Sequence, residues 1–298
     1  MDTQVTVEVV VDTTANSEAR GENALGQAFA WFGAVEAACS RFDPASEVRE
    51  LASRPGEAVR VGPVLFQAVR LALEVARRSG GAFDPTVGPR MEARGFDRDY
   101  RTGRSAPSGL RPTAAVSWRD VSLDGRGRTI RLRRPALLDL GGVAKGLAVD
   151  LALRALAGFA GCAVEAGGDL AVRGVNARGG PWRIGIRHPR RPGAVCAVLD
   201  LSNGAVCTSG DYERRAPCGD GGGHHVEPRS GQPAEAAASC TVLAPHAALA
   251  DALSTAASVL RPERAIAWLQ RQGVDGVLVT RALEPLITSG LAGLSVCL

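Results

Sequence analysis

An acid and a hydroxyl four positions apart, Asp251 and Thr255, stand in the otherwise apolar stretch AALADALSTAASVL, residues 247–260. Residues four apart on a helix share one face, about one turn from each other. Asp251 is the only charged residue of this stretch, so we expect an enclosed carboxylate, which needs a partner. Carboxylate and hydroxyl oxygens one turn apart suit a hard cation such as Mg²⁺. A solvated polar stripe that also includes Ser258 remains the alternative.

A single lysine, Lys145, follows a glycine pair in LDLGGVAKGLAVD, residues 138–150. The glycines at 141 and 142 allow backbone N–H groups to approach a ligand closely, and the helix predicted to follow directs its positive end to the same place. Lys145 could hold a phosphate there as a point charge. The P-loop pattern is absent, and a Gly-Gly turn with a lysine extending into water is the alternative.

Two adjacent histidines, His224 and His225, begin the stretch HHVEPRSG (224–231), which follows CTSGDYER (207–214) and a glycine-rich segment. The chain has only 4 histidines, so the pair is a candidate general base, because imidazole exchanges protons near neutral pH. A polar hairpin without a chemical role is the alternative.

Both strands and helices must position these residues. Alternating valines predict a strand over 3–11, and helical spacing predicts helices over 18–41, from Pro63 to the Gly80-Gly81 pair, over 141–157, 247–260 and 262–272. Further strands are predicted over 116–123, 128–132, 136–140, 162–166, 169–173, 182–187, 195–201, 239–243 and 275–280, and a surface loop over 90–112. Runs of strands with helices between some of them indicate an α+β fold with a largely antiparallel sheet.

Composition narrows the class of protein. With 45% hydrophobic and 22% charged residues, the 298-residue chain is typical of soluble globular proteins, and 35 basic against 31 acidic residues give no nucleic-acid footprint. The 7 cysteines include no C-x-x-C pair, which favours a reducing compartment. The N-terminus lacks the regions of a signal peptide, and no apolar run reaches about 18 residues. We expect a cytoplasmic protein with no transmembrane segment and no nucleic-acid partner, unless an upstream leader is missing.

Nine stretches in order along the chain resemble the ApbE family of flavin transferases, which move FMN from FAD onto a Thr or Ser of a target protein. They are MDTQVTVEV (from Met1), SRFDPASEVREL (40–51), GAFDPTVGP (81–89), LDLGGVAKGLAVD (138–150), AVEAGGDLAVRG (163–174), WRIGIRHP (182–189), AVCTSGDYER (205–214), HHVEPRSG (224–231) and ADALSTA (250–256). The resemblance implies one α+β unit of the ApbE type, T-fold-like, over 1–298.

The resemblance also implies roles for individual residues. It places FAD against Met1, Phe42, Ala82, Phe83, Asp84, Asp139, Lys145, His225 and Val226. It places Mg²⁺ on Asp251, Thr255 and an oxygen of the glycine turn near Gly142. His224 matches the histidine of the family's H-x-x-D/E-P signature and would act as the base toward the acceptor hydroxyl, while Asp211 matches the acid of its T-S-G-D segment.

Some positions depart from the family pattern. Phe42 stands where a tyrosine is common, so a hydroxyl contact is lost while ring stacking remains. Ala52 stands in place of a frequent asparagine, Arg90 in place of an apolar residue, and Glu227 in place of the aspartate before Pro228. These departures bear on substrate and location more than on flavin binding.

The function implied is Mg²⁺-dependent transfer of FMN from FAD to a Thr or Ser hydroxyl of an acceptor protein, with release of AMP. It requires Lys145 and Asp251, about a hundred positions apart, to meet at one diphosphate. A FAD pyrophosphatase that uses water as the acceptor, a non-catalytic FAD-binding protein and an interaction protein without flavin are the alternatives.

Overall fold

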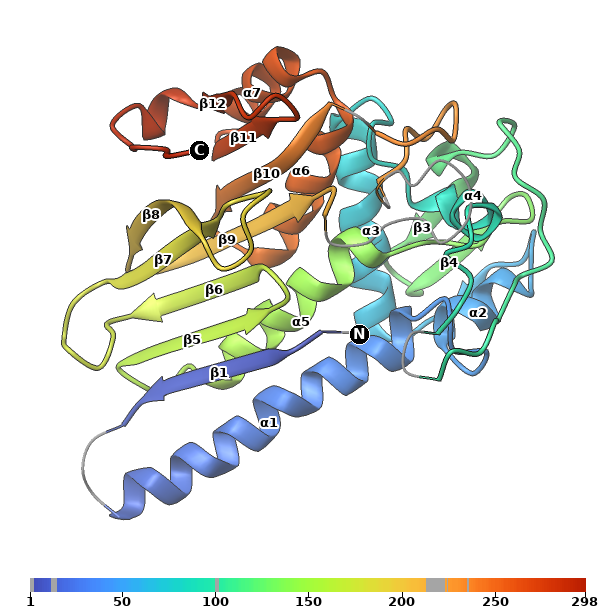
Figure 1. Ribbon diagram of the computed structural model, residues 1–298. Coiled ribbons are helices and arrows are strands. Elements are labelled where there is room, and N and C mark those ends of the chain that lie inside the picture. The colour runs from blue at the N-terminus through green and yellow to red at the C-terminus, as the bar shows by residue number, and fades with distance from the viewer. Residues whose placement is uncertain (1–2, 12–14, 100–101, 213–222, 224, 235) are drawn as a thin grey trace.

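A computed structural model describes residues 3–11, 15–99, 102–212, 223, 225–234 and 236–298 (Figure 1). Its centre is a seven-stranded sheet in the order β1-β5-β6-β9-β10-β11-β12. The strands are β1 (Val5–Val10), β5 (Gly161–Ala166), β6 (Asp169–Gly174), β9 (Asn203–Gly210), β10 (Ala237–Ala244), β11 (Asp275–Thr280) and β12 (Pro285–Ile287). Every pair of neighbours is antiparallel, which confirms the predicted α+β class with a largely antiparallel sheet.

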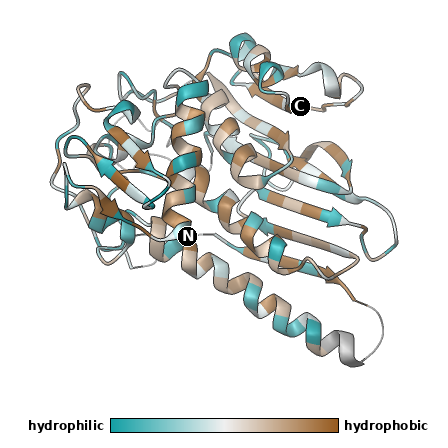
Figure 2. Cartoon of the chain, turned by 180° about the vertical axis from the view of Figure 1, so that it is seen from behind, coloured by the Kyte–Doolittle hydropathy of each residue, from teal (hydrophilic) through white to brown (hydrophobic). Residues whose placement is uncertain are grey.

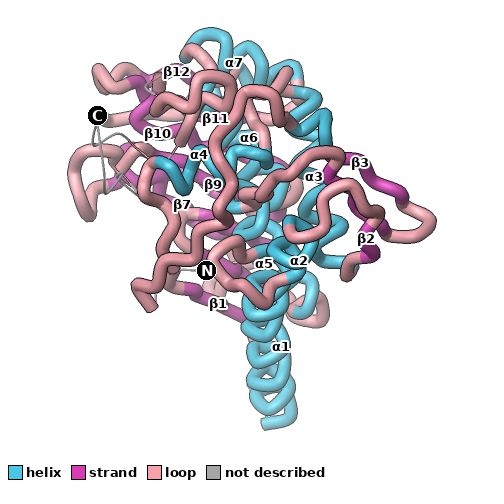
Figure 3. Tube along the Cα trace, turned by 90° about the vertical axis from the view of Figure 1, so that its right-hand side faces the viewer, coloured by secondary structure: helices cyan, strands magenta, loops and turns pink. Residues whose placement is uncertain are grey.

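Helices cover one face of this sheet. They are α1 (Ala15–Cys39), α3 (Pro63–Arg78), α5 (Gly141–Ala155), α6 (Ala247–Val259) and α7 (Pro262–Arg271). Viewed from the side in Figure 3, the large sheet lies on the left, these helices in the middle, and part of a small second sheet on the right. The small sheet contains β2 (Val59–Arg60), β3 (Val121–Asp124) and β4 (Thr129–Leu132). Two further helices, α2 (Glu47–Ala52) and α4 (Gly88–Ala93), are short.

A hairpin of β7 (Trp182–Arg187) and β8 (Val195–Leu201) covers the opposite face of the sheet. Because side chains alternate along a strand, each central strand contributes to two apolar clusters. In β5, Val164 packs in the cluster on the helix side, whereas its neighbour Ala163 packs with the hairpin. Helix α1, the long helix seen from behind in Figure 2, alternates between hydrophilic and hydrophobic residues along its length, as a helix with one buried face does.

Helices α5 and α6 approach each other closely at one glycine. A Cβ atom on Gly146 would lie 2.4 Å from the backbone oxygen of Ala247, so only glycine permits this approach. One turn further along α5, the carboxylate of Asp150 accepts the backbone N–H groups of Ala247 and Ala248 at 2.8 and 2.9 Å. This carboxylate caps α6, since the first N–H groups of a helix lack partners within it. The two helices are thereby fixed next to each other.

The structure corrects several predicted elements. Residues 136–140 form no strand, although Leu137, Leu138 and Leu140 are almost fully buried, because an apolar run predicts burial and not the conformation of the backbone. The first residues of the predicted loop 90–112 belong to α4, and the strand predicted over 116–123 begins only at Val121. Elements that were not predicted are α2, β2, β9 and β12. None of the described helices combines the length and apolar character needed to cross a membrane.

Candidate functional site

A cavity of about 770 Å³ opens between the first turn of α5, the end of β9 and the helix α6. Most of the residues assigned to FAD or metal from the sequence lie in its wall. These are Phe42, Ala82, Phe83, Asp84, Asp139, Gly142, Lys145, His225, Val226, Asp251 and Thr255. Met1 and His224 lie outside the described residues.

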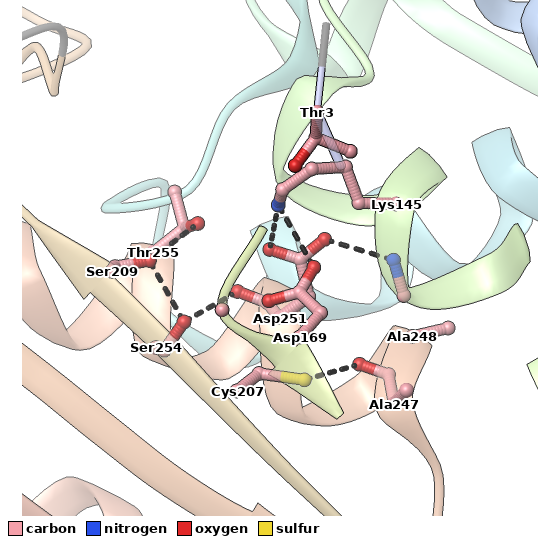
Figure 4. Close-up of polar contacts among 12 residues, drawn as sticks. Thr3, Lys145, Asp169, Cys207, Ser209, Ala247, Ala248, Asp251, Ser254 and Thr255 are labelled. Carbon is pink, nitrogen blue, oxygen red and sulfur yellow. Dashed lines mark hydrogen bonds and ion pairs between the residues drawn. The ribbon is translucent and has the colours of Figure 1, made fainter. Parts of the chain in front are cut away.

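Lys145 lies between two carboxylates in this cavity (Figure 4). Its Nζ donates to Oδ2 of Asp169 at 2.8 Å and lies 3.5 Å from Oδ1 of Asp251. Burial lowers the pKa of the ammonium group, but the negative charges of Asp169 and Asp251 outweigh burial and raise it above its ordinary value. The charged form of Lys145 is therefore favoured. Lys145 and Asp251 lie side by side, as the sequence led us to expect.

Asp169 is a member of the site that the sequence analysis did not single out. It is 1% exposed and begins β6, directly after a tight turn in which Gly167 and Gly168 have φ values of +55° and +90°. Glycine is the residue that adopts such values without strain. Burial, and then the Asp251 carboxylate, raise the pKa of Asp169 to about 8 against the opposing effect of Lys145. The available sequence signal was an acid directly after a glycine pair between two predicted strands.

Asp251 and Thr255 lie one turn apart on α6 and both line the cavity. Asp251 is 2% exposed, and its Oδ2 accepts the backbone N–H of Gly146 at 3.3 Å. Gly142, in the first turn of α5, faces this pair, because a Cβ atom there would lie 2.8 Å from Oγ1 of Thr255. The absence of a side chain at 142 leaves room in front of the threonine hydroxyl.

The charges and donor atoms around Asp251 fit a hard divalent cation. Two buried carboxyl groups, on Asp169 and Asp251, face a single ammonium group, and their mutual repulsion contributes to the raised pKa of Asp169. A bound cation would relieve this repulsion. Within the part of the chain that the structure describes, Oδ1 of Asp169 is buried without a hydrogen bond. The carboxylate of Asp251 and the hydroxyl of Thr255 are oxygen ligands of the kind that Mg²⁺ accepts.

Aromatic rings form another part of the wall. Phe83 is 5% exposed, and its ring would be 3.1 Å from a Cβ atom on Gly142. Phe42 is half-buried and carries the guanidinium carbon of Arg41 at 4.1 Å from its ring centre, a cation–π distance. Such apolar surfaces with a few polar groups are typical of sites for cofactors and other small molecules.

Two of the acids in the wall mainly shape the backbone. Asp139 accepts Nε of Arg41 at 2.8 Å and the backbone N–H of Gly141 at 2.9 Å, so it joins Arg41 to the start of α5. The carboxylate of Asp84 accepts from the backbone N–H and hydroxyl of Thr86, at 2.9 and 2.7 Å, and from the backbone N–H of Trp118 at 3.1 Å. These bonds fix the segment that carries Phe83.

Asp211 lies just after β9 and outside the cavity wall. Its two oxygens accept NH1 and NH2 of Arg190 at 2.6 and 2.8 Å, and Nε of Arg281 lies 3.6 Å away. The carboxylate thus ties the loop after β7 to the end of β9, next to the cavity residue Gly210. His225, in contrast, lines the cavity, and burial followed by the charge of Lys145 lowers its pKa to about 4, with Asp211 opposing the shift.

A model of the ApbE family matches residues 1–278 of the chain. A FAD:protein FMN transferase of Rhodobacter capsulatus is 34% identical over 282 residues, which are 90% of this chain and 52% of that protein. The chain therefore spans about half the length of this relative. A FAD:protein FMN transferase of Treponema pallidum is 33% identical over 261 residues, covering 78% of this chain and 70% of the relative.

Solved structures give the same result. An ApbE protein of Thermotoga maritima superposes with a TM-score of 0.81 at 29% identity and covers 97% of both chains. The flavinyl transferase ApbE of Pseudomonas stutzeri, in its apo form, superposes with a TM-score of 0.79 at 28% identity, covering 97% of this chain and 92% of the other. These likenesses confirm the ApbE-type fold that the sequence motifs implied.

Proposed function

Because this chain belongs to the ApbE family, we propose that it transfers FMN from FAD to a Thr or Ser hydroxyl of an acceptor protein and releases AMP, with Mg²⁺ bound at Asp251 and Thr255. One observation supports this proposal most directly: Lys145 and Asp251 lie 3.5 Å apart in the wall of the same cavity. We also propose that residues 1–298 form one domain, since one apolar cluster draws on residues from Ala24 to Leu278.

The cavity has the size and lining that a flavin dinucleotide needs. Its volume of about 770 Å³ lies within the range of roughly 300–1,000 Å³ usual for small-molecule sites. Phe42 and Phe83 offer apolar surface for a ring, and the ammonium of Lys145 offers a point charge for a diphosphate. FAD contains both a flavin ring and a diphosphate.

The reaction is a phosphoryl transfer, in which positioning and charge neutralisation supply most of the catalysis. The acceptor oxygen forms a bond to the phosphorus on the FMN side, and the bond from that phosphorus to the bridging oxygen breaks, so AMP leaves with this oxygen. His224 takes the proton of the acceptor hydroxyl, and Lys145 offsets the charge that builds on the leaving phosphate. When bound, Mg²⁺ supplies further neutralisation of the phosphate oxygens. Asp211 acts at a distance, through Arg190, by holding the strand end beside the cavity.

An Asp251→Asn variant tests this proposal, because the amide keeps the size of the side chain and removes the charge that a cation requires. We expect FMN transfer to fall by at least a hundredfold while the circular dichroism spectrum is unchanged. Candidate acceptor proteins are coexpressed with the wild type or the variant and examined by mass spectrometry for an added FMN on Thr or Ser.

A parallel measurement of AMP separates the alternatives. Release of AMP from FAD and Mg²⁺ without any acceptor protein would favour a pyrophosphatase. Tight binding of FAD with no release of AMP under any condition would favour a carrier. Full transfer activity in Asp251→Asn would show that the metal site is assigned to the wrong residue.

A further inference from the structure

Three hydroxyl groups form a chain between β9 and α6 beside the cavity (Figure 4). Oγ of Ser209 lies 2.8 Å from Oγ of Ser254 and 3.3 Å from Oγ1 of Thr255. Ser209 is 7% exposed and Ser254 is fully buried, so water does not compete freely for these groups. Hydrogen bonds between buried groups are costly to break, and the chain therefore has a defined arrangement.

One backbone oxygen fixes the direction of the chain. Oγ of Ser254 donates to the backbone oxygen of Asp251 at 2.9 Å. A hydroxyl has a single hydrogen, so in its contact with Ser209 the Ser254 oxygen can only accept. Ser209 then has no hydrogen left, and its contact with Thr255 must be donated by Thr255.

The direction of these bonds determines what Thr255 presents to the cavity. Its hydrogen points to Ser209, and its oxygen lone pairs remain for another partner. A cation binds to oxygen lone pairs and is repelled by a hydroxyl hydrogen. We propose that Ser209 and Ser254 are positioning residues that hold the Thr255 hydroxyl in the orientation of a cation ligand. This inference rests on the proposed Mg²⁺ site.

The chain provides a matched control for this proposal in Ser258. Its hydroxyl is also buried on α6, at 5% exposure, and donates to the backbone oxygen of Ser254 at 2.8 Å. This bond involves none of the three hydroxyl groups of Ser209, Ser254 and Thr255. Replacing Ser258 by alanine thus removes a similar buried group from the same helix without changing the direction of the Ser209–Thr255 bond.

The test measures binding of Mn²⁺ alone, from the electron paramagnetic resonance signal of the free ion. Groups that orient a metal ligand typically change metal affinity by about 10- to 100-fold. We expect Ser209→Ala, in which Thr255 loses its acceptor, to weaken Mn²⁺ binding by about tenfold. Ser254→Ala should have the same effect, because the Ser209 hydrogen then turns to Thr255 and reverses the bond. Ser209→Thr, which keeps a hydroxyl, and Ser258→Ala should bind Mn²⁺ as the wild type does.

Two results would overturn the proposal. One is that Ser209→Ala and Ser254→Ala both bind Mn²⁺ with the affinity of the wild type. If only one of these two variants folds, wild-type affinity in that variant is enough. The other is an equal loss in Ser258→Ala, which would assign the effect to helix packing. The wild type could also bind no Mn²⁺, while quenching of the flavin fluorescence still shows that it binds FAD. The metal assignment of the proposed function would then fail, and the role of the serines would fail with it.

Discussion

Between its two carboxylate partners, the ammonium of Lys145 is much closer to Asp169 than to Asp251, at 2.8 against 3.5 Å. A charge-assisted hydrogen bond is roughly twice as strong as one between neutral groups. Asp169 therefore decides where the positive charge lies. It also leaves Asp251 available to the cavity, where a carboxylate bound fully by a lysine would be a poor ligand.

Replacing Asp169 by asparagine should move this charge. The amide keeps the shape of the side chain, but it no longer attracts the ammonium, so Lys145 turns toward Asp251 and away from a bound diphosphate. We expect the Kd for FAD, measured by quenching of flavin fluorescence, to rise about tenfold, which corresponds to about 1.4 kcal/mol. Asp124→Asn is the control. Asp124 is an exposed residue at the end of β3, and its carboxylate accepts the backbone N–H of Arg126. An unchanged Kd in Asp169→Asn would contradict the role given to this residue.

At the scale of helices and strands, the site depends on the contact between α5 and α6. Lys145 lies next to Gly146, where the backbones meet, and Asp251 lies on the next turn of α6 after Ala247. Any widening at Gly146 moves the lysine away from the acid. The same glycine thus serves both the packing of the helices and the geometry of the cavity.

Gly146→Ala should destabilise the protein, because its Cβ atom would lie 2.4 Å from the oxygen of Ala247 and 2.7 Å from Cα of Ala248. Overpacking of this kind costs about 1–3 kcal/mol. Gly33→Ala is the matched control: Gly33 is exposed in the middle of α1 and has nothing within 4 Å of its Cβ position. That change should instead raise the free energy of unfolding by about 0.4–1 kcal/mol. Urea unfolding measures both, and equal stabilities would refute this account of the helix contact.

The elements differ in how well the sequence predicted them. Helix α6 was predicted to within one residue of its end, because a long run of helix-forming residues depends little on the rest of the chain. Strand β9 was not predicted, since NGAVCTSG contains glycines and hydroxyl residues and becomes a strand only through pairing with β6 and β10. The position of Asp169 depends on the same sheet. Local patterns could therefore place Asp251 and Thr255 on one helix face, but they could not bring Asp169 of β6 and Ser209 of β9 next to that face.

At the scale of the whole molecule, a neutral histidine in the cavity links folding to pH. Burial lowers the pKa of His225 from 6.5 to about 4 in the folded chain, while the unfolded chain keeps the ordinary value. Between these values the unfolded chain binds a proton that the folded chain does not. The contribution of His225 to the free energy of unfolding therefore falls as the pH decreases from about 6.5 to about 4.

His225→Gln should reduce this dependence on pH, because glutamine does not titrate. We expect the wild type to lose more stability than the variant when urea unfolding is repeated at pH 7.5 and at pH 5. The comparison uses the difference between the two proteins, so that other titrating groups cancel. A variant with the same loss as the wild type would show that His225 does not titrate in this way.

The residues that enclose the cavity come from distant parts of the chain, and they include Arg41 after α1 and Thr255 in α6. A ribosome adds about 5–20 residues per second, so on the order of 10–40 seconds separate the synthesis of these two positions. Until α6 has left the exit tunnel, the nascent polypeptide lacks the acid and the hydroxyl that this helix contributes to the cavity wall. A polypeptide that stops before α6 would therefore carry Lys145 of the proposed site without Asp251 and Thr255.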